Sequence, residues 1–506
     1  MAKRLVLQIC LFYFCVVVTT TCPLAQTAKR PDSRLVLDSS DARLVSAFNW
    51  AKRQALAYVF DDDPVGPWYE AALPGREAFC MRDVSHQSMG AHALGLEKYT
   101  RNMLRRFAEN VTDARDWASL WEINRLNLPP ATDYKNDSEF WYDLPANFDV
   151  LDSAYRMYLW TGDLSYANDP VFLNFYERTV NDYVQRWDLG LDKVMTRHHP
   201  MNVRSKTGSL NDKFVFFRGL PGYPENRQGY AVSVDLLATQ YSAYRGYAFI
   251  QSVRRNLDSA QALLKRAADV KSLVNTTWWN DSTHHFYATL DKDHQLQGRA
   301  GSALLYRDIA DDGPKAKAAL DDFVADIKSR STGVEGKSHH AEILYRYGLP
   351  DLAYEQMLDL ASENHPRREY PEVSYSVVGA IVTGTMGINV APPSPVESRT
   401  AGDYVEIIIK TLPALTKQTP WAELRNLPVR RNLVSIRHEG LQRTIFTNQA
   451  GPSLIWQAGL PGSFPSLVVN GMPVKATLGK EYIDRAVSWV RVPVGAGNTV
   501  TVEIPK

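Results

Sequence analysis

The stretch Ala391-Pro392-Pro393-Ser394-Pro395 divides the sequence into two regions of different character. Its prolines make a stiff connection through which neither a helix nor a central strand continues. Before this stretch, apolar residues recur at helical spacing, and after it, short runs alternate between apolar and polar residues. The sequence therefore predicts a mainly α domain followed by a smaller all-β domain.

The helical region, over residues 40–390, contains roughly eleven segments with an apolar stripe at helical period. Leu44, Phe48 and Ala55 belong to one such stripe, and a later segment stops at Gly162, in the position of a helix C-cap. Short turns rich in Gly, Pro or Asp join many of these segments in pairs. Antiparallel helix pairs repeated around a ring form an (α/α)6 toroid, which is the fold we predict.

The region after the proline-rich stretch, residues 396–506, has the pattern of short strands. Turn signals such as Asn470-Gly471 and Gly495-Ala496-Gly497 separate its alternating runs. We predict a C-terminal β-sandwich domain. It has few convergent polar groups, which favours a supporting or accessory role.

The N-terminus has the pattern of an export signal. Lys3 and Arg4 precede an apolar run over residues 5–18, and cleavage is expected near residue 25, so that residues 1–25 form a signal peptide. The run is shorter than the ~20 residues that span a bilayer, so we expect no transmembrane segment in the mature chain. The protein is expected to be secreted or periplasmic, with a lipid anchor at Cys22 as an alternative.

Composition excludes several classes of function. The chain of 506 residues has 57 basic and 56 acidic side chains and a formal net charge of +1, without a long basic run, so we expect no nucleic-acid partner. Removal of the signal would leave Cys80 as the one cysteine, and therefore no internal disulfide. Adjacent histidine pairs lack the spacing of a zinc helix, and no phosphate-binding glycine loop is present, so neither a metal nor another cofactor is predicted.

Residues 73–83 bring two carboxylates and two guanidiniums together between two helical patterns: Arg76, Glu77, Arg82 and Asp83. Hydrolysis of a glycosidic bond needs two carboxyl groups in different environments, one neutral and one ionised. An aromatic, partly desolvated setting would keep one carboxyl of this loop protonated as a general acid. Two ion pairs that fix the loop are an equally good interpretation.

A second segment, residues 139–149, mixes aromatic rings with carboxylates just before a helix. Trp141 would suit stacking on a sugar face, and Asp143 or Asp149 would suit binding of two hydroxyls. Negative charge is also favourable at a helix N-terminus for structural reasons alone, so Asp149 could be no more than a capping residue.

A third acidic segment lies at the join between two late helices. Glu369 and Glu372 flank Pro371, which breaks any helical continuation between them. Glu335, in Gly333-Val334-Glu335-Gly336, stands at another helix start. Any of these carboxylates could activate water as a general base, and loop ion pairs explain each of them equally well. His86, at the start of a helix, is more typical of a cap or core histidine.

The order of these motifs resembles the six-hairpin glycosidase superfamily, most nearly the α-L-rhamnosidase-like family. Five stretches carry the resemblance: Leu73-Pro74-Gly75-Arg76-Glu77 with Met81-Arg82-Asp83, Leu144-Pro145 through Thr161-Gly162-Asp163, Asn226 to Tyr287, Gly348 to Tyr354, and Ser374 to Pro393. Helices are expected to begin almost directly after the signal, without the large N-terminal β-domains common in rhamnosidases. Ala72 stands where the family's first motif opens with an acidic residue.

The resemblance implies an exported glycoside hydrolase that cleaves a glycosidic bond in an oligosaccharide or polysaccharide with inversion. Glu77 would be the general acid, and Glu369, with Glu372 in reserve, the general base. The remaining candidates would bind the substrate: Arg76, Asp83, Trp141, Asp143, Asp149 and Glu335.

Two other functions stay open. A polysaccharide lyase on the same fold would abstract a proton beside a uronate carboxyl, with Tyr230 or His339 as base and Arg227 as the neutralising cation. A non-catalytic glycan-binding protein would use the same groove without turnover.

Overall fold

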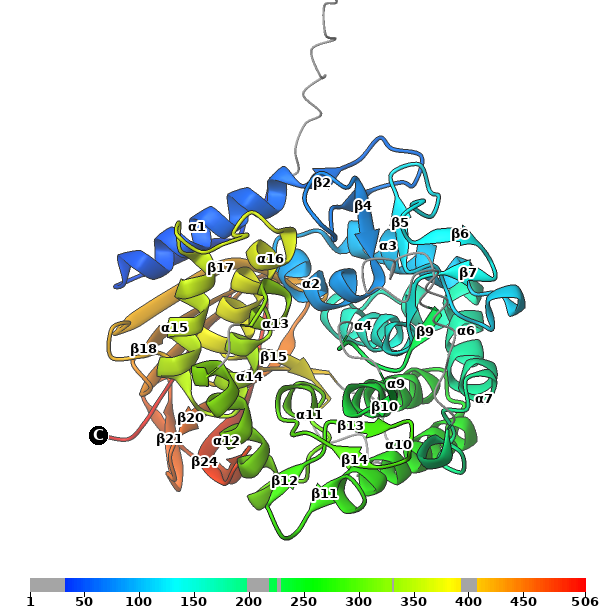
Figure 1. Cartoon of the computed structure of the whole chain (residues 1–506). Helices are drawn as coiled ribbons and strands as arrows, with labels where there is room; N and C mark the ends of the chain where they lie inside the picture. The colour runs from blue at the N-terminus through cyan, green and yellow to red at the C-terminus, as the bar shows by residue number, and fades with distance from the viewer. Residues whose placement is uncertain (1–31, 198–217, 225–228, 330–331, 393–406) are drawn as a thin grey trace, which may run out of the picture.

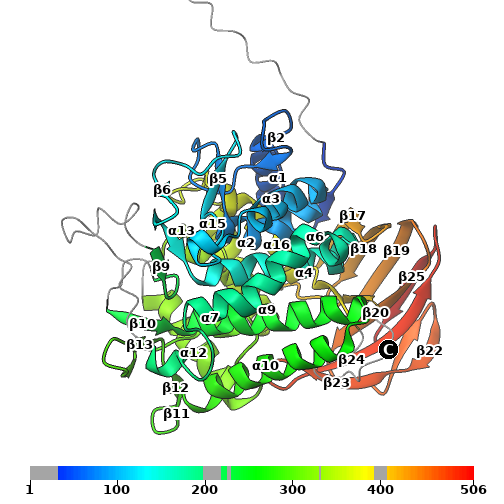
Figure 2. The same cartoon turned by 90° about the vertical axis from the view of Figure 1, so that its right-hand side faces the viewer.

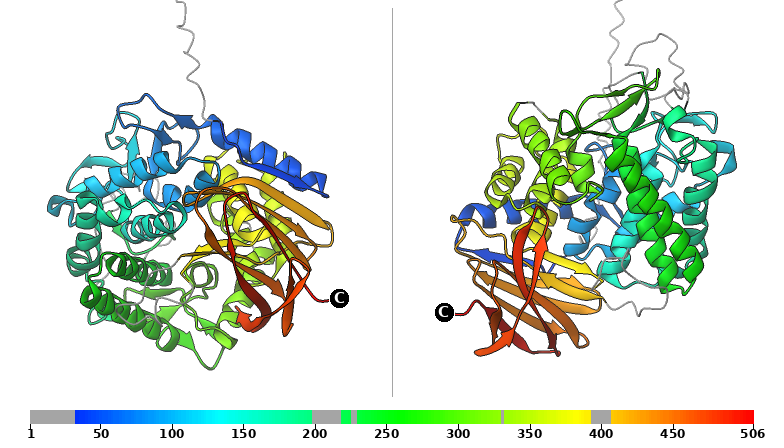
Figure 3. Two further views of the ribbon diagram at one scale, coloured as in Figure 1. Left: turned by 180° about the vertical axis from the view of Figure 1, so that it is seen from behind. Right: turned by 90° about the horizontal axis from the view of Figure 1, so that it is seen from below.

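The computed structural model describes residues 32–197, 218–224, 229–329, 332–392 and 407–506. The predicted signal peptide, Cys22 and Pro393–Pro395 lie outside these residues. The described chain forms a helical domain with a β domain packed against one side of it (Figure 1 and Figure 3). The predicted mainly α domain and C-terminal β domain are therefore confirmed.

One set of helices in the described chain forms the centre of the helical domain. Each contacts the next along the chain, and the last contacts the first. The members are α2 (Met81–Ala93), α4 (Pro145–Thr161), α9 (Val234–Val253), α11 (Ser302–Tyr306), α14 (His340–Arg346) and α16 (Pro371–Ala380). Helix α9 is buried on almost all sides, as a helix that is apolar all round must be. Gly90 permits the close approach of α2 to α16, because a Cβ there would lie 2.0 Å from the Tyr375 carbonyl oxygen.

A second set of helices covers the first from outside. Its members are α1 (Ala42–Ala57), α3 (Glu97–Glu109), α6 (Pro170–Arg178), α10 (Leu257–Thr276), α12 (Pro314–Ser329) and α15 (Pro350–Ala361). Each buries a single apolar stripe; in α10 the stripe includes Leu263, Ala267 and Val270. Shorter helices lie between them: α5 (Ser165–Asn168), α7 (Val184–Arg186) and α13 (Val334–Lys337). No helix in the described ranges has both the length and the apolar character needed to cross a membrane.

The β domain consists of two sheets in the described chain, one 7-stranded with order β1-β17-β18-β19-β25-β21-β22 and one 5-stranded with order β15-β16-β20-β24-β23. The first contains β1 (Val36–Ser39), β17 (Trp421–Val429), β18 (Asn432–Glu439), β19 (Arg443–Ala450), β25 (Thr499–Glu503), β21 (Ser466–Val469) and β22 (Met472–Lys475). The second contains β15 (Ile388–Ala391), β16 (Ile408–Thr411), β20 (Leu454–Pro461), β24 (Arg485–Val494) and β23 (Thr477–Glu481). Phe446 of one sheet stacks on Trp456 of the other, with ring centroids 4.9 Å apart.

The β domain also takes a strand from the beginning of the described chain. Strand β1 pairs antiparallel with β17, with Leu37 opposite Leu424, and both side chains are buried. Strand β1 corrects the expectation that helices begin almost directly after the signal. Its partner β17 lies in the last quarter of the chain, so no local pattern indicates the pairing. Strand β15 follows the last central helix in the chain and pairs with β16. Figure 2 shows β17, β18, β19 and β25 together at one side of the helical domain.

Short strands at one end of the helical domain fix the segments that enter the central helices. Strand β4 (Ala78–Cys80) ends directly before α2, β8 (Tyr142–Asp143) just before α4, and β10 (Tyr230–Ser233) directly before α9. Their partners are β5 (Glu122–Asn124), β9 (Arg218–Leu220) and β13 (Thr289–Asp291). The other short strands are β2 (Val59–Phe60), β3 (Trp68–Tyr69), β6 (Tyr134–Asn136), β7 (Glu139–Phe140), β11 (Trp279–Asn280), β12 (His285–Phe286) and β14 (Leu296–Gln297). The polar residues at these helix starts are thereby held on a rigid support.

Candidate active site

A cavity of about 810 Å³ lies among the central helices. This volume is within the ~300–1,000 Å³ usual for small-molecule sites. Its polar lining comes from α2, the loop before β10, α9, the end of α11, α13, α14 and α16. These side chains include Arg82, His86, Tyr223, Asp235, Tyr306, Arg307, Glu335, His339, His340 and Glu372.

Glu372 contributes a buried carboxyl to this cavity. Pro371 occupies the first turn of α16, where its missing N–H costs no hydrogen bond, and Glu372 follows it with 9% of its surface exposed. Burial raises the pKa of Glu372 well above its usual range, and the negative charges of Asp83 and Glu335 raise it further against the opposing effect of Arg82. This carboxyl therefore holds a proton at a pH where an ordinary glutamate is ionised.

Two other acidic side chains, Asp83 and Glu335, are near enough to Glu372 for their charge to raise its pKa. Asp83 lies in the first turn of α2, where a negative charge is favourable, and its Oδ1 is 3.4 Å from Nε of Arg82. Glu335, on α13, lines the cavity and accepts a hydrogen bond of 3.1 Å from Nη1 of Arg367. The site thus combines one protonated carboxyl with two carboxylates that have cationic partners.

Asp149 is the centre of a buried polar network beneath the cavity. It forms a close ion pair with Arg307, accepts a hydrogen bond from the Tyr223 hydroxyl, and lies 3.6 Å from Nε2 of His86. Burial acts to raise the pKa of Asp149, but the charge of Arg307 and the hydrogen bonds from His86 and Tyr223 outweigh it, so that the pKa is lowered. Arg307 also reaches Asp152 at 2.6 Å. Asp149 has no exposed surface, so it supports the cavity lining instead of touching its contents.

Two histidines pack face to edge at the cavity wall. The ring centroids of His86 and His339 are 4.3 Å apart, and that of Tyr306 is 4.7 Å from His339. Burial lowers the pKa of both histidines. Asp149 opposes this effect at His86 without cancelling it, and the guanidinium of Arg307 lowers the pKa of both further. Each ring is therefore neutral near pH 7 and offers one donor and one acceptor, which suits sugar hydroxyls.

Arg76 and Glu77, in the first half of the first acidic segment, lie apart from the cavity. The side chain of Glu77 is 60% exposed and pairs with Nη1 of Arg125 at 2.8 Å. Arg76 bridges two buried acidic side chains, Glu122 and Asp133, at 2.7 Å each, and burial raises the pKa of Glu122 to about 10. Neither Glu77 nor Arg76 lines the cavity. Ion pairs do hold this loop, but the partners of Arg76 and Glu77 are distant in sequence.

Other predicted residues also lie elsewhere. Glu369 is exposed in the turn before α16, and its backbone carbonyl accepts hydrogen bonds from Tyr58 and Gln54. Trp141 and Asp143 are buried, and the Trp141 ring packs edge-on against Trp121 with centroids 6.5 Å apart. A ring buried in this way has no face left for a sugar.

Of the residues predicted for a lyase, only His339 is found in the cavity lining of the described residues. Tyr230 is buried, and its hydroxyl donates to the carbonyl oxygens of Gly222 and Pro224. Arg227 lies outside the described residues. His339 does line the cavity.

Sequence reasoning missed several lining residues. Arg307, Tyr306 and Tyr223 stand in no recognisable motif, and their neighbours in the site are far away in the sequence. Arg82 and His86 carried a usable signal, because residues four apart on a helix share one face.

Comparisons with known proteins support the fold. No family model matches the chain, and no curated protein sequence matches it. Among solved structures, an alpha-L-rhamnosidase from Dictyoglumus thermophilum superposes with a TM-score of 0.55 at 13% identity, over 93% of this chain and 50% of that one. A GH78 family rhamnosidase of Bacillus sp. GL1 gives a TM-score of 0.53 at 12% identity, over 83% of this chain and 41% of that one.

A protein described as a sialidase gives a TM-score of 0.50 at 12% identity, over 80% of this chain and 38% of that one. The chain thus spans half or less of the length of these solved structures. At such identities the likeness concerns the fold alone. The resemblance to rhamnosidase-type proteins that the motif order predicted is confirmed at that level.

Proposed function

We propose that the chain is an exported glycoside hydrolase of the six-hairpin type that cleaves a glycosidic bond in an oligosaccharide or polysaccharide. Its helical domain, over about residues 40–390, would be an (α/α)6 toroid, and residues 396–506 would form the core of a supporting β-sandwich. The closed succession of contacts from α2 to α16 and back supports the toroid. The observation that carries the proposal is the buried Glu372, whose surroundings raise its pKa, beside Glu335 in the lining of a cavity of about 810 Å³.

The proposed reaction needs one acid and one base. Glu372 would donate its proton to the glycosidic oxygen, so that the bond to the leaving group breaks without an expelled alkoxide. Glu335 would remove a proton from a water molecule that attacks the anomeric carbon from the opposite face, and the configuration would invert. Inversion requires the two carboxyl groups to lie about 6.5–9.5 Å apart, whereas roughly 5–5.5 Å would favour retention.

Glu77 and Glu369 stay sequence predictions for the same two roles. Their surroundings do not favour them, since both side chains are exposed and neither lines the cavity. Asp83 would act on Glu372 through its charge. Asp149 would hold His86 and Tyr223 in place for the sugar, instead of binding it directly.

The charges of the cavity favour a neutral sugar over a uronate. In the described lining each guanidinium already has a carboxylate partner: Arg82 with Asp83, Arg307 with Asp149, and Arg299 with Asp322 at 3.4 Å. A lyase needs a cation for the uronate carboxyl and a base of suitable pKa. The presence of His339 and Tyr306 favours a lyase as the second candidate, but burial raises the pKa of Tyr306 and so weakens it as a base at neutral pH.

The test is a digestion of plant and bacterial glycans in which new reducing ends and the ultraviolet absorbance of new double bonds are followed together. Wild type, Glu372→Gln, Glu335→Gln and Glu77→Gln would be compared. Reducing ends without new absorbance, lost in the first two variants and kept in the third, would support the proposal. Absorbance that rises with cleavage would identify a lyase. Binding without turnover in every variant would identify a glycan-binding protein.

A further inference from the structure

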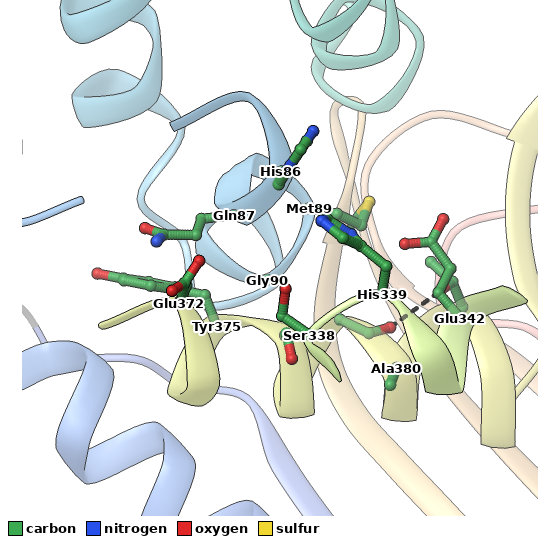
Figure 4. A pocket seen from close by; sticks show the side chains of 13 residues that line it. His86, Gln87, Met89, Gly90, Ser338, His339, Glu342, Glu372, Tyr375 and Ala380 are labelled. Atoms are coloured by element: carbon green, nitrogen blue, oxygen red, sulfur yellow. Dashed lines mark hydrogen bonds between the residues drawn. The ribbon is translucent and has the colours of Figure 1, made fainter. Parts of the chain in front are cut away.

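A second, much smaller cavity adjoins the large one at Glu372 (Figure 4). Its volume is about 20 Å³, and it shares His86, His339 and Glu372 with the large cavity. Gln87, the next residue along α2, lines only the small cavity. The two cavities therefore meet at the carboxyl that we propose as the proton donor.

The amide of Gln87 has no hydrogen-bond partner among the described residues. Its side chain is 2% exposed, and both Nε2 and Oε1 are buried without a partner. Buried amides in folded proteins are almost always hydrogen-bonded to protein or to ordered water, because an unsatisfied one is costly. Glu372 extends toward the same space from α16 (Figure 4). The small cavity thus presents an unsatisfied amide and a carboxyl to a single occupant.

The volume of the small cavity indicates which molecule can occupy it. A water molecule needs about 10–15 Å³ of such volume and two to four polar partners. The space of about 20 Å³ holds one water molecule and no sugar. Met89, Gly90 and Ala380 supply apolar walls. Ser338, Glu342 and Thr383 also line the cavity, but each has a hydrogen-bond partner of its own.

We propose that the small cavity binds one ordered water molecule that links the Gln87 amide to the Glu372 carboxyl, and that Gln87 is thereby a positioning residue for the proton donor. The catalytic half of this inference rests on the proposed function, whereas the water site does not. The fold supports a fixed geometry, because Gly90 and Tyr375 touch one helical turn beyond Gln87 and Glu372 respectively. The two polar groups are therefore held on opposite sides of a rigid helix contact.

The bridging water has a defined effect on proton donation. Once Glu372 has given up its proton, the water can donate a hydrogen bond to the new carboxylate while it accepts one from Gln87 Nε2. Hydrogen bonds to the charged form favour that form. Loss of the bridge would raise the pKa of Glu372 further, so the proton would be donated less readily.

The test combines a crystal structure of the wild-type protein with a Gln87→Met variant, which keeps the length of the side chain and removes its polar atoms. We expect an ordered water peak about 3 Å from both Gln87 and Glu372 in the wild type, and its loss in the variant. In the variant, kcat should fall about tenfold, less than the ~10²-fold or more for loss of a general acid. The alkaline limb of its pH–rate profile should move to higher pH.

Gln261→Met is the matched control, because it makes the same substitution at an exposed position of α10 that lines neither cavity. It should keep the water peak, kcat and the pH profile. An empty cavity in the wild-type crystal, or a Gln87→Met profile identical to that of Gln261→Met, would overturn the proposal. If the wild type cleaves no glycan, the proposed function fails, and the crystal structure still decides the water site on its own. The wild-type crystal also decides it if Gln87→Met does not fold.

Discussion

Glu77 and Glu372 both stand in short acidic segments beside arginines, yet the fold gives them opposite surroundings. The Glu77 side chain is 60% exposed and forms a surface ion pair with Arg125. Glu372 is buried at the start of a central helix, beside other negative charges, and keeps its proton. The same side chain is thus a surface ion-pair partner in one place and a candidate acid in the other. Environment separates the two, and local sequence does not.

Substituting Glu372 and Glu77 in turn tests this comparison, and the largest expected effect is on catalysis. Glu372→Gln removes the proton donor, and kcat should fall by about 10²–10⁴-fold. Glu77→Gln should leave kcat unchanged, because its side chain is remote from the cavity. Release of reducing ends measures both, with circular dichroism as the check on folding. The opposite pattern, with only Glu77→Gln inactive, would restore Glu77 as the acid.

A second contrast concerns ion pairs and stability. Arg307→Met leaves the charge of Asp149 buried and uncompensated, which should lower the free energy of unfolding by about 3–5 kcal/mol. Urea denaturation followed by tryptophan fluorescence measures this loss. The double variant with Asp149→Asn should recover part of it, since fewer buried charges are then left unpaired. A loss below the error of the measurement would mean that water reaches Asp149.

The third prediction sharpens the pKa contrast. As an acid, Glu372 works only while protonated, so activity should fall as pH rises through its raised pKa. Asp83→Asn removes a negative charge that helps to raise this pKa. The alkaline limb of the pH–rate profile should therefore move to lower pH, whereas Glu77→Gln should leave it in place. A shift to higher pH in Asp83→Asn would contradict the assigned sign.

The smallest effect is expected at the exposed ion pair of Glu77 with Arg125. Arg125→Gln removes the partner of Glu77, and the free energy of unfolding should change by less than about 1 kcal/mol. High salt should reduce even this difference, because solvent-exposed pairs are screened. A loss as large as that of Arg307→Met would show that the loop over residues 73–77 contributes more to the free energy of unfolding than its exposure suggests.

Local patterns predicted what local forces decide. The stripe of Leu263, Ala267 and Val270 faces the core as its spacing required, and Gly162 adopts a left-handed conformation with φ 68° at the end of α4. Trp141 and Glu77 stay predictions that rest on residue type alone, since both types suit a sugar site. Burial of one and exposure of the other depend on neighbours that the sequence does not place.

The rest of the site arises from long-range contacts. Arg307 meets Asp149 across 158 positions of sequence, and nothing local distinguishes it from other arginines. Glu372 is the intermediate case. The sequence predicts Glu369 and Glu372 as alternatives for the general base, and only the start of α16 at Pro371 separates the buried one, which we propose as the acid, from the exposed one.

Strand β1 bears on how the chain is made. The Ser39 hydroxyl donates a hydrogen bond to the backbone carbonyl of Trp421, 382 positions later. The first described strand therefore pairs with a strand that is synthesised late. On the ribosome this strand must wait, unpaired, while the whole helical domain is synthesised. Closing so long a loop is slow, and an unpaired strand edge is a template for other chains. Residence with a chaperone until synthesis ends would protect it, and a β domain expressed alone would lack this edge.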